Sequence, residues 1–373
     1  MRAVAVVAVL GAACRIQDID YTGKACPCPG GWTCDPASMT CARGVFPAGD
    51  APGSDARPPP DVAPGTFAYR SRLTIHNAAT ASLPAGFTIR VPLDLSALVT
   101  GGKVRADYSD LRVIGDGFIG ERDRIIDPAA GPAPAGLSFS LASPLDPGAT
   151  TTAYALYYGS ATIATAAPAD GTAVFQVYDD FTTGISSIWL VNDTASASGG
   201  QLILHANHTD ALTTNAATDN IPIVSAVELI ATVLDPNSNP TVQTDGTFYY
   251  WFGYQMTGAF TPVADPWILW IARGKSGIGV EQKSPIGCES GCAPQPGTQT
   301  SSAHYYAIER DPGESRFYYD DAAAQAITVT NSTDYSLMVR NFMATSDVQI
   351  DYIRARARVS PDPTVTVGVE ETL

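Results

Sequence analysis

The chain has 373 residues, 45% of them hydrophobic, and a formal net charge of −15 at pH 7. An acidic chain is repelled by phosphate backbones, so the charge argues against nucleic acid as a partner. Residues 67–373 are enough for two domains of about 150 residues each.

The N-terminus carries a short apolar leader. Arg2 is followed by an unbroken run of Ala, Val, Leu and Gly that ends at Ala13. The run is much shorter than the ~20 apolar residues that a membrane-spanning helix needs, and it has the length of the apolar core of a secretory signal. We therefore predict that residues 1–13 are a signal peptide.

The end of this leader resembles a bacterial lipobox, in which small residues precede a cysteine that becomes lipidated. Cys14 stands at that position, although Leu10 lies four residues before it and the lipobox pattern prefers three. The resemblance implies a lipid at Cys14 that anchors the protein to a membrane, at the outer membrane or cell surface; stable anchoring takes two acyl chains or more. The chain has 7 cysteines, and a lipid on one of them leaves an even number for disulfides. The alternative is an ordinary cleaved signal, with Cys14 unmodified.

Residues 14–43 form a short segment rich in Cys, Gly and Pro. Small exported modules with little core are commonly held together by disulfides, so two disulfides are predicted here. A bridge between Cys26 and Cys28 would close a very tight ring, which favours the two pairings that avoid it. A zinc site with four thiolates is the alternative, but zinc ribbons usually carry two C-x2-C motifs and this segment has neither. The four cysteines concerned are Cys26, Cys28, Cys34 and Cys41.

Proline, glycine and cysteine residues also mark a linker and a loop that a disulfide would close. Residues 44–66 contain 6 prolines and 3 aspartates, which predicts an extended, solvated linker. Cys288 and Cys292 lie in a Gly- and Pro-rich loop, and a third disulfide between them would stiffen it.

From residue 67 onward, short runs of alternating apolar and polar residues recur between Gly, Pro, Asn and Asp. No helical periodicity of useful length interrupts them. The pattern predicts an all-β chain with two antiparallel β-sandwich domains, 67–173 and 174–373, behind the small disulfide-rich segment.

The first domain resembles a known bacterial family in three places. Tyr69-Arg70-x-x-Leu73-Thr74-Ile75 begins the match, Ser109-Asp110-Leu111-Arg112-Val113 is its middle, and Tyr154-Ala155-Leu156-Tyr157-Tyr158-Gly159 closes it. Together they resemble the bacterial domain of unknown function 2341. The resemblance implies an extracellular β-sandwich and brings no activity with it.

The second domain resembles a concanavalin A-like jelly roll. Tyr178-Asp179-Asp180-Phe181 followed by Trp189 is similar to the opening of that fold, and Val348-Gln349-Ile350-Asp351-Tyr352-Ile353-Arg354 is similar to its closing strand. The fold class hosts lectins, glycosidases and inert spacers, so the resemblance does not decide the function.

An aromatic strand marks the candidate ligand site of this domain. Along residues 248–254, Phe248, Tyr250, Phe252 and Tyr254 alternate with Tyr249 and Trp251, and the two sets fall on opposite faces. One face must be core, and the other could stack on the apolar faces of a polysaccharide. The alternative is that both faces are structural. Candidate ligand-binding residues are Tyr249, Trp251, Trp267 and Trp270, the last two on opposite faces of their own strand.

The string Glu309-Arg310-Asp311-Pro312-Gly313-Glu314 matches the E-x-D-x-x-E motif of retaining jelly-roll glucanases, which use two carboxylates ~5 Å apart. Asp-Pro-Gly is a turn signal, and apolar strands flank it. We therefore interpret the string as the tip of a hairpin and predict no catalytic residues.

Two metal sites come into consideration. Asp179 and Asp180 on the first strand and Asp351 on the last would form a structural calcium site if those strands meet, because calcium prefers several oxygen ligands. The alternative is that Asp180 caps a turn and Asp351 faces solvent at the edge of a sheet. The segment from His205 through His208 to Asp210 could hold zinc, but its spacing fits neither a helix motif nor one strand face, and it is interpreted as a strand-to-loop segment.

Three functions compete. The leading hypothesis is a surface lipoprotein whose second sandwich binds a glycan or another extracellular ligand. A structural or adhesive surface protein with protein partners is the second, and a glycoside hydrolase is the third and least favoured.

Overall fold

The computed structural model divides the chain into two compact units, residues 1–56 and residues 57–373. It describes residues 33–35, 40–42, 67–116, 119–128, 131–163, 165–214, 221–222, 224–233, 248–255, 267–273, 277–283, 302–320, 322–328, 336–341 and 347–373. For residues 33–35, 40–42, 233, 248–251, 255, 267–273, 277–283, 322–325 and 327–328 it describes the backbone alone.

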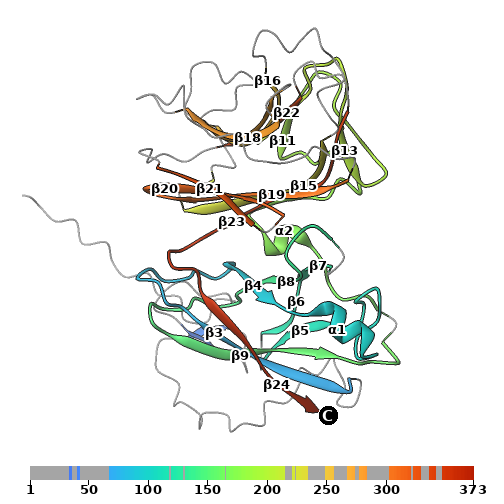
Figure 1. The fold of residues 1–373 in the computed structure, drawn as a ribbon. Coiled ribbons are helices and arrows are strands. Elements are labelled where there is room, and N and C mark those ends of the chain that lie inside the picture. Colours follow the sequence, from blue (N-terminus) through green and yellow to red (C-terminus); the bar gives the residue numbers. More distant parts are fainter. Residues whose placement is uncertain are drawn as a thin grey trace, which may run out of the picture. The chain divides into compact units, whose positions relative to one another are not determined.

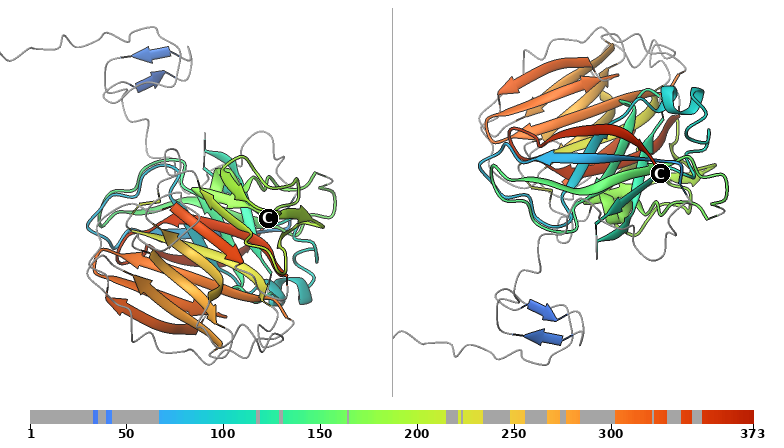
Figure 2. Two further views of the ribbon diagram at one scale, coloured as in Figure 1. Left: turned by 90° about the horizontal axis from the view of Figure 1, so that it is seen from above. Right: turned by 90° about the horizontal axis from the view of Figure 1, so that it is seen from below.

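In the first unit, β1 (Thr33–Asp35) and β2 (Thr40–Ala42) form the antiparallel pair drawn in dark blue in Figure 2. Their register sets the backbone of Cys34 directly opposite that of Cys41. A bridge between these two would leave Cys26 with Cys28, which is the pairing that the sequence disfavours. The cysteine side chains lie outside the described residues, so the disulfides stay predictions.

The second unit begins with a sandwich of two antiparallel sheets. The five-stranded sheet has the order β24 (Thr364–Thr372), β3 (Tyr69–His76), β9 (Thr150–Tyr158), β5 (Arg112–Gly115) and β6 (Gly120–Arg122). The three-stranded sheet has the order β4 (Thr88–Pro92), β8 (Gly136–Ser140) and β7 (Arg124–Asp127). Alternating apolar side chains of both sheets, such as Leu73, Ile89 and Phe139, are fully buried between them.

Two short helices are attached to this sandwich. Asp94 caps the N-terminus of α1 (Leu95–Thr100) by accepting from the backbone N–H of Ala97, and Asp170 caps α2 (Gly171–Val174) by accepting from Thr172. Within the described ranges, no helix has the length and apolar character needed to cross a membrane.

The second sandwich follows α2. Its eight-stranded sheet contains β12 (Ser196–Ser198), β13 (Gln201–Leu204), β23 (Val348–Ala357), β15 (Ser225–Val233), β19 (His304–Asp311), β20 (Glu314–Tyr319) and β21 (Ala322–Thr328) in that order, with β10 (Val177–Asp179) also paired to β23. Its six-stranded sheet has the order β11 (Trp189–Asn192), β14 (Ala211–Thr214), β22 (Ser336–Asn341), β16 (Phe248–Gln255), β17 (Trp267–Arg273) and β18 (Gly277–Lys283).

The chain crosses repeatedly between these two sheets, which is how a jelly roll wraps its core. The opening strand β10 and the closing strand β23 pair directly, with Tyr178 opposite Arg354. The prediction of an all-β chain with antiparallel sandwiches is confirmed.

The last strand departs from the predicted boundaries. The range 174–373 was predicted as one domain, but β24 leaves the second sandwich and pairs with β3 along the edge of the five-stranded sheet, as Figure 2 shows. The second sandwich is therefore inserted between strands of the first. The alternation in β24 identifies it as a strand, but the partner of a strand is not a local property of its sequence.

Buried ion pairs join the two sandwiches at the outer face of the eight-stranded sheet, which lies between the six-stranded sheet and the first sandwich (Figure 1). Arg354 of β23 is 1% exposed and donates to both carboxylate oxygens of Asp127 of β7, at 3.0 and 2.9 Å. It also donates to Glu228 of β15 at 2.8 Å. Burial alone would raise the pKa of Glu228, but Arg354, Arg90 and Arg356 outweigh burial and lower that pKa below its ordinary value.

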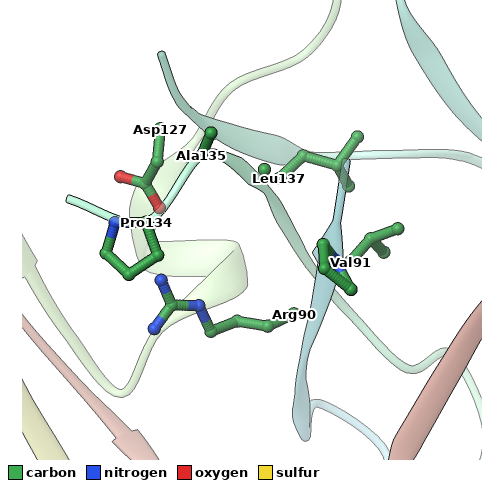
Figure 3. A pocket seen from close by; sticks show the side chains of 8 residues that line it. Arg90, Val91, Asp127, Pro134, Ala135 and Leu137 are labelled. Carbon is green, nitrogen blue, oxygen red and sulfur yellow. The ribbon is translucent and has the colours of Figure 1, made fainter. Parts of the chain in front are cut away.

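A cavity of about 160 Å³ lies beside these ion pairs, and Arg90 and Asp127 line it together with Pro134 and Leu137 (Figure 3). Arg90 is within 3.4 Å of Glu228, and Asp127 is held by Arg354. Because the charged groups of the cavity are already paired, we assign it to the contact between the sandwiches and not to a ligand.

Candidate ligand-binding face

The candidate site is the outer face of the six-stranded sheet, and β16 lies near its centre. Phe252 and Tyr254 of β16 are 5% and 0% exposed and belong to the core between the two sheets. Successive residues of a strand belong to opposite faces, so positions 251, 253 and 255 belong to the outer face.

Residues directly opposite each other in an antiparallel pair share a face, so the register of β16 assigns the positions of β22. Val339 and Leu337 pair with Phe252 and Tyr254 and are buried in the same core. Arg340 pairs with position 251 and Met338 pairs with position 253, so both belong to the outer face.

On the other side of β16, its pairing with β17, and the pairing of β17 with β18, show which positions of those two strands belong to the inner or the outer face. Trp270 pairs with Phe252 and so takes an inner-face position. Trp267 pairs with Gln255 at the outer face, and Lys283 of β18 continues that row. The outer positions of these three strands include Trp251, Gln255, Trp267, Glu281 and Lys283.

The β14–β22 half of this outer face is screened from solvent. Met338 and Thr213 are 0% exposed, and Arg340 is 5% exposed. Burial lowers the pKa of the Arg340 guanidinium to about 10, which still leaves it charged at neutral pH. The outer positions of β16, β17 and β18 are the remaining part of this face, and they are the candidate ligand-binding positions.

The register divides the four predicted aromatic residues. Trp251 and Trp267 occupy outer-face positions, whereas Trp270 occupies an inner one. Tyr249 falls at the irregularity between Phe248 and Tyr250, where the register does not assign a face. The side chains of all four lie outside the described residues.

The carboxylates of the E-x-D-x-x-E string lie on a hairpin, as the sequence predicts. Glu309 and Asp311 end β19, and Asp311 pairs with Glu314 across the turn into β20. The guanidinium of Arg358 is 3.3 Å from Glu309 and 3.4 Å from Asp311, and Arg316 is 2.8 Å from Glu314. Each carboxylate is neutralised by arginine at the end of a strand pair, which is not the arrangement of two free carboxyl groups that glycoside hydrolysis requires.

The three aspartates predicted to hold calcium have separate roles. Asp179 is 6% exposed and accepts from the indole N–H of Trp189 at 2.9 Å and from the N–H groups of Phe181 and Ser186. Asp180 accepts from the N–H of Thr182, and Asp351 accepts from the side chain of Gln201. The first and last strands do meet, but within the described ranges these carboxylates do not form a group of three metal ligands.

The remaining predicted site residues lie beyond what the structure describes. Cys14, Cys26, Cys28, Cys288 and Cys292 are outside the described residues, and only the backbone of Cys34 and Cys41 is inside them. Lipidation of Cys14 and the disulfides stay predictions.

Sequence patterning missed the polar positions that share a face with Trp251 and Trp267. Residues 277–283 begin with Gly-Ile-Gly, and glycine is unfavourable in strand interiors, so the sequence pattern does not predict the strand that is found there. Alternation of Val280, Glu281, Gln282 and Lys283 was the available signal, but only the register shows which of them face outward.

Comparison with known proteins gives limited information. No family model matches the chain, and no curated protein matches it. Among solved structures, the laminarinase catalytic domain of Thermotoga petrophila is 14% identical with a TM-score of 0.36, over 48% of this chain and 96% of its own. The Bacillus licheniformis β-glucanase is 12% identical with a TM-score of 0.39, over 49% and 98%. A Flavobacterium laminarinase has the same identity and TM-score, over 49% and 99%. At these values the likeness supports no inference about the activity of this chain.

Proposed function

We propose that the protein is an extracytoplasmic, lipid-anchored binding protein whose second sandwich binds an oligosaccharide chain across β16, β17 and β18. The observation that carries the proposal is the register, which gathers Trp251, Trp267, Gln255, Glu281 and Lys283 on the face opposite the core. Tryptophan rings offer the apolar faces of sugars a flat partner. Amide and charged groups supply the few polar contacts that orient a ligand.

The spacing of the two tryptophan positions favours a chain of sugars over a single sugar. Trp251 pairs with Ile271 and Trp267 pairs with Gln255, so the two positions are four residues apart along the strands and one strand apart across them. At 3.4 Å per residue and 4.8 Å per strand, their separation is about 14 Å. One ring cannot stack on both positions, whereas two separated rings of one chain can.

The proposed role is binding without hydrolysis. The one carboxylate motif that matches a glycosidase lies on the β19–β20 hairpin, in the other sheet, and is neutralised by arginines. The Pro-rich linker of residues 44–66 is the segment that would hold the folded part away from the membrane.

Oligosaccharide binding is tested on the full mature chain with a glycan array, followed by calorimetric titration of the best β-glucan or other oligosaccharide. Trp251→Ala and Trp267→Ala should each weaken binding at least tenfold, about 1.4 kcal/mol, because each removes a stacking platform. Leu190→Ala is the matched control: Leu190 is 42% exposed on β11, an edge strand of the same sheet. The control should bind like the wild type.

Two results would contradict the proposal. One is a wild-type chain that binds no glycan on the array. The other is glycan binding that survives in the Trp251→Ala, Trp267→Ala double variant while that variant keeps its melting temperature.

The anchor is tested separately. Intact-mass analysis of the membrane fraction should show a diacylglyceryl adduct on Cys14, because the leader ends in a lipobox-like sequence. Cys14→Ala should move the protein to the soluble fraction. An unmodified Cys14 in a soluble mature chain would show that the leader is an ordinary cleaved signal.

A further inference from the structure

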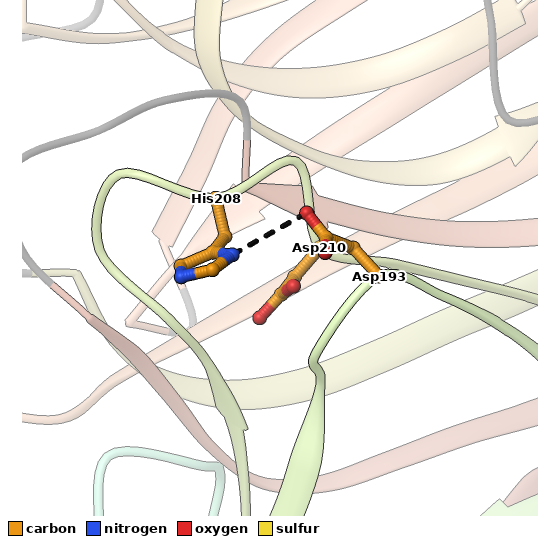
Figure 4. A group of neighbouring side chains, drawn as sticks. All are labelled: Asp193, His208 and Asp210. Carbon is orange, nitrogen blue, oxygen red and sulfur yellow. Dashed lines mark ion pairs between the residues drawn. The ribbon is translucent and has the colours of Figure 1, made fainter.

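Three metal-ligating side chains meet at one end of the second sandwich. Asp193 lies in the turn after β11, and His208 and Asp210 lie in the connection between β13 and β14. One ligand atom from each of the three lies within 4.8 Å of the others. Figure 4 shows the imidazole of His208 and the carboxylate of Asp193 facing each other beside Asp210.

The distance between His208 and Asp193 is that of two ligands of one ion. Nδ1 of His208 is 3.5 Å from Oδ2 of Asp193, which is longer than a normal hydrogen bond. In a tetrahedral zinc site the metal–nitrogen and metal–oxygen distances are about 2.0–2.2 Å, which places two ligand atoms about 3.4 Å apart. A cation between these two groups therefore requires almost no movement of either.

The third group, Asp210, is held rigidly. It is 0% exposed, and its carboxylate accepts from the N–H groups of Thr194 at 2.8 Å and His205 at 2.6 Å. Nδ1 of His205 is a further 2.9 Å from Oδ2 of Asp210. Such second-layer hydrogen bonds fix the orientation of metal-binding carboxylates.

The charge of this group calls for a cation. In the described part of the chain, the ion-pair partners of Asp193 and Asp210 are histidines, at 3.5 and 2.9 Å. The buried carboxylates Asp127 and Glu228 are different, because arginine neutralises both. The carboxylates of Asp193 and Asp210 lie close together without an arginine among these ion-pair partners, and a divalent ion between them would relieve their repulsion.

We propose that Asp193, His208 and Asp210 bind a divalent cation of the zinc class, with water completing the coordination. The imidazole nitrogen favours borderline metals such as Zn²⁺, Co²⁺ or Ni²⁺ over Ca²⁺ and Mg²⁺, which prefer oxygen ligands throughout. The Thr194 hydroxyl, 3.0 Å from Oδ1 of Asp210, can rotate away to free a lone pair for the metal. The ion would join the turn after β11 to the β13–β14 connection.

The test is calorimetric titration of Zn²⁺ into the full mature chain after chelator treatment. Asp193→Asn and His208→Ala should each weaken one binding event at least tenfold, and Zn²⁺ should raise the melting temperature of the wild type but not of these variants. Both side chains are exposed, by 37% and 45%, so the fold should survive. His76→Ala is the matched control, because His76 lies in the first sandwich, where Nδ1 of its imidazole is 3.0 Å from Thr150 Oγ1.

Cobalt distinguishes this site from the cysteines of the N-terminal segment. Co²⁺ bound by nitrogen and oxygen should give visible d–d bands that disappear in His208→Ala, without the near-ultraviolet charge-transfer band of cobalt thiolate. The proposal is overturned if the wild type binds no Zn²⁺, if both variants bind it as the wild type does, or if the only cobalt spectrum is that of a thiolate site.

Discussion

The two outer faces of the second sandwich differ in how their polar residues are used. On the eight-stranded sheet, Glu228 and Arg354 face the first sandwich, and Asp127 completes a buried ion-pair network with them. On the six-stranded sheet, Gln255 and Lys283 share an outer face with two tryptophan positions.

We interpret this difference as a division between a face that joins the two sandwiches and a face that is proposed to bind a ligand. Charges that are fully buried and paired, such as those of Arg354 and Glu228, hold two sandwiches in one arrangement. Polar positions beside aromatic ones on a face away from that contact are suited to a ligand. Under the proposed function, substitutions on the two faces should therefore have different effects.

The largest effect is expected at the contact between the sandwiches. Arg354→Ala should lower the free energy of unfolding by about 3–5 kcal/mol, because it removes the arginine that lies nearest to both buried carboxylates. Glu228 then keeps the longer contacts to Arg90 and Arg356, at 3.4 Å. Chemical denaturation of the variant and the wild type measures this. Arg316→Ala is the control: its ion pair with Glu314 is 40% and 38% exposed, and its loss should cost less than about 1 kcal/mol. Equal effects at the two arginines would mean that the buried pairs do not hold the sandwiches together.

The next largest effect concerns β17, where substitutions at an inner-face and an outer-face position should differ in how much they destabilise the fold. Trp270→Ala should destabilise the fold by about 3 kcal/mol, since its position shares the core face with Phe252, whereas Trp267→Ala should change the melting temperature little. Thermal unfolding of both variants makes the comparison. If Trp267→Ala were the more destabilising, the register of β16 and β17 would assign the wrong face to the ligand.

The pH dependence of stability tests the ion-pair network again. The pKa of Glu228 is lowered in the folded state, below an unfolded value of about 4.3. Its ionised form therefore contributes stability that is fully present above that pH and is lost as the pH falls towards the folded-state pKa. As the pH falls below about 4.3, the free energy of unfolding should decrease less steeply in Glu228→Gln than in the wild type. The two slopes should differ by up to about 1.4 kcal/mol per pH unit. Identical slopes in both proteins would contradict the lowered pKa.

The smallest effect is expected at the hairpin carboxylates. Glu309→Gln should change the free energy of unfolding by about 1 kcal/mol or less, because both of its arginine partners, Arg356 and Arg358, keep Asp362 as an ion-pair partner and glutamine still offers a hydrogen-bond acceptor. Glycan binding should be unchanged, and neither protein should hydrolyse β-glucans. The prediction is contradicted if the wild type hydrolyses β-glucans and Glu309→Gln abolishes this activity while keeping the fold. Catalysis would then belong to the β19–β20 hairpin of the eight-stranded sheet.

Local features of the fold could be predicted from the sequence. The aromatic strand that the sequence predicts along residues 248–254 is β16 (Phe248–Gln255). The Asp311-Pro312-Gly313 turn was predicted as a hairpin tip and is one. These succeed because alternation and turn residues act over a few positions of the chain.

Features that depend on distant partners could not be predicted. Nothing in the alternation of residues 364–372 points to β3, which is nearly the whole chain away. The faces of Trp267 and Trp270 required the pairing with Phe252, and the metal group required Asp193, which lies in a different turn from His208. A hydrophobic pattern gives the face of a strand only relative to its own neighbours, so register and tertiary contact decide the rest.

The return of β24 to the first sandwich has a mechanical consequence. Two chain segments, the one through α2 and the one between β23 and β24, connect the second sandwich to the first. A pulling force on a glycan held by the second sandwich would be divided between both segments. The segment that ends in β24 would load the β24–β3 ladder along its length, so that its hydrogen bonds resist in shear together and do not open one at a time.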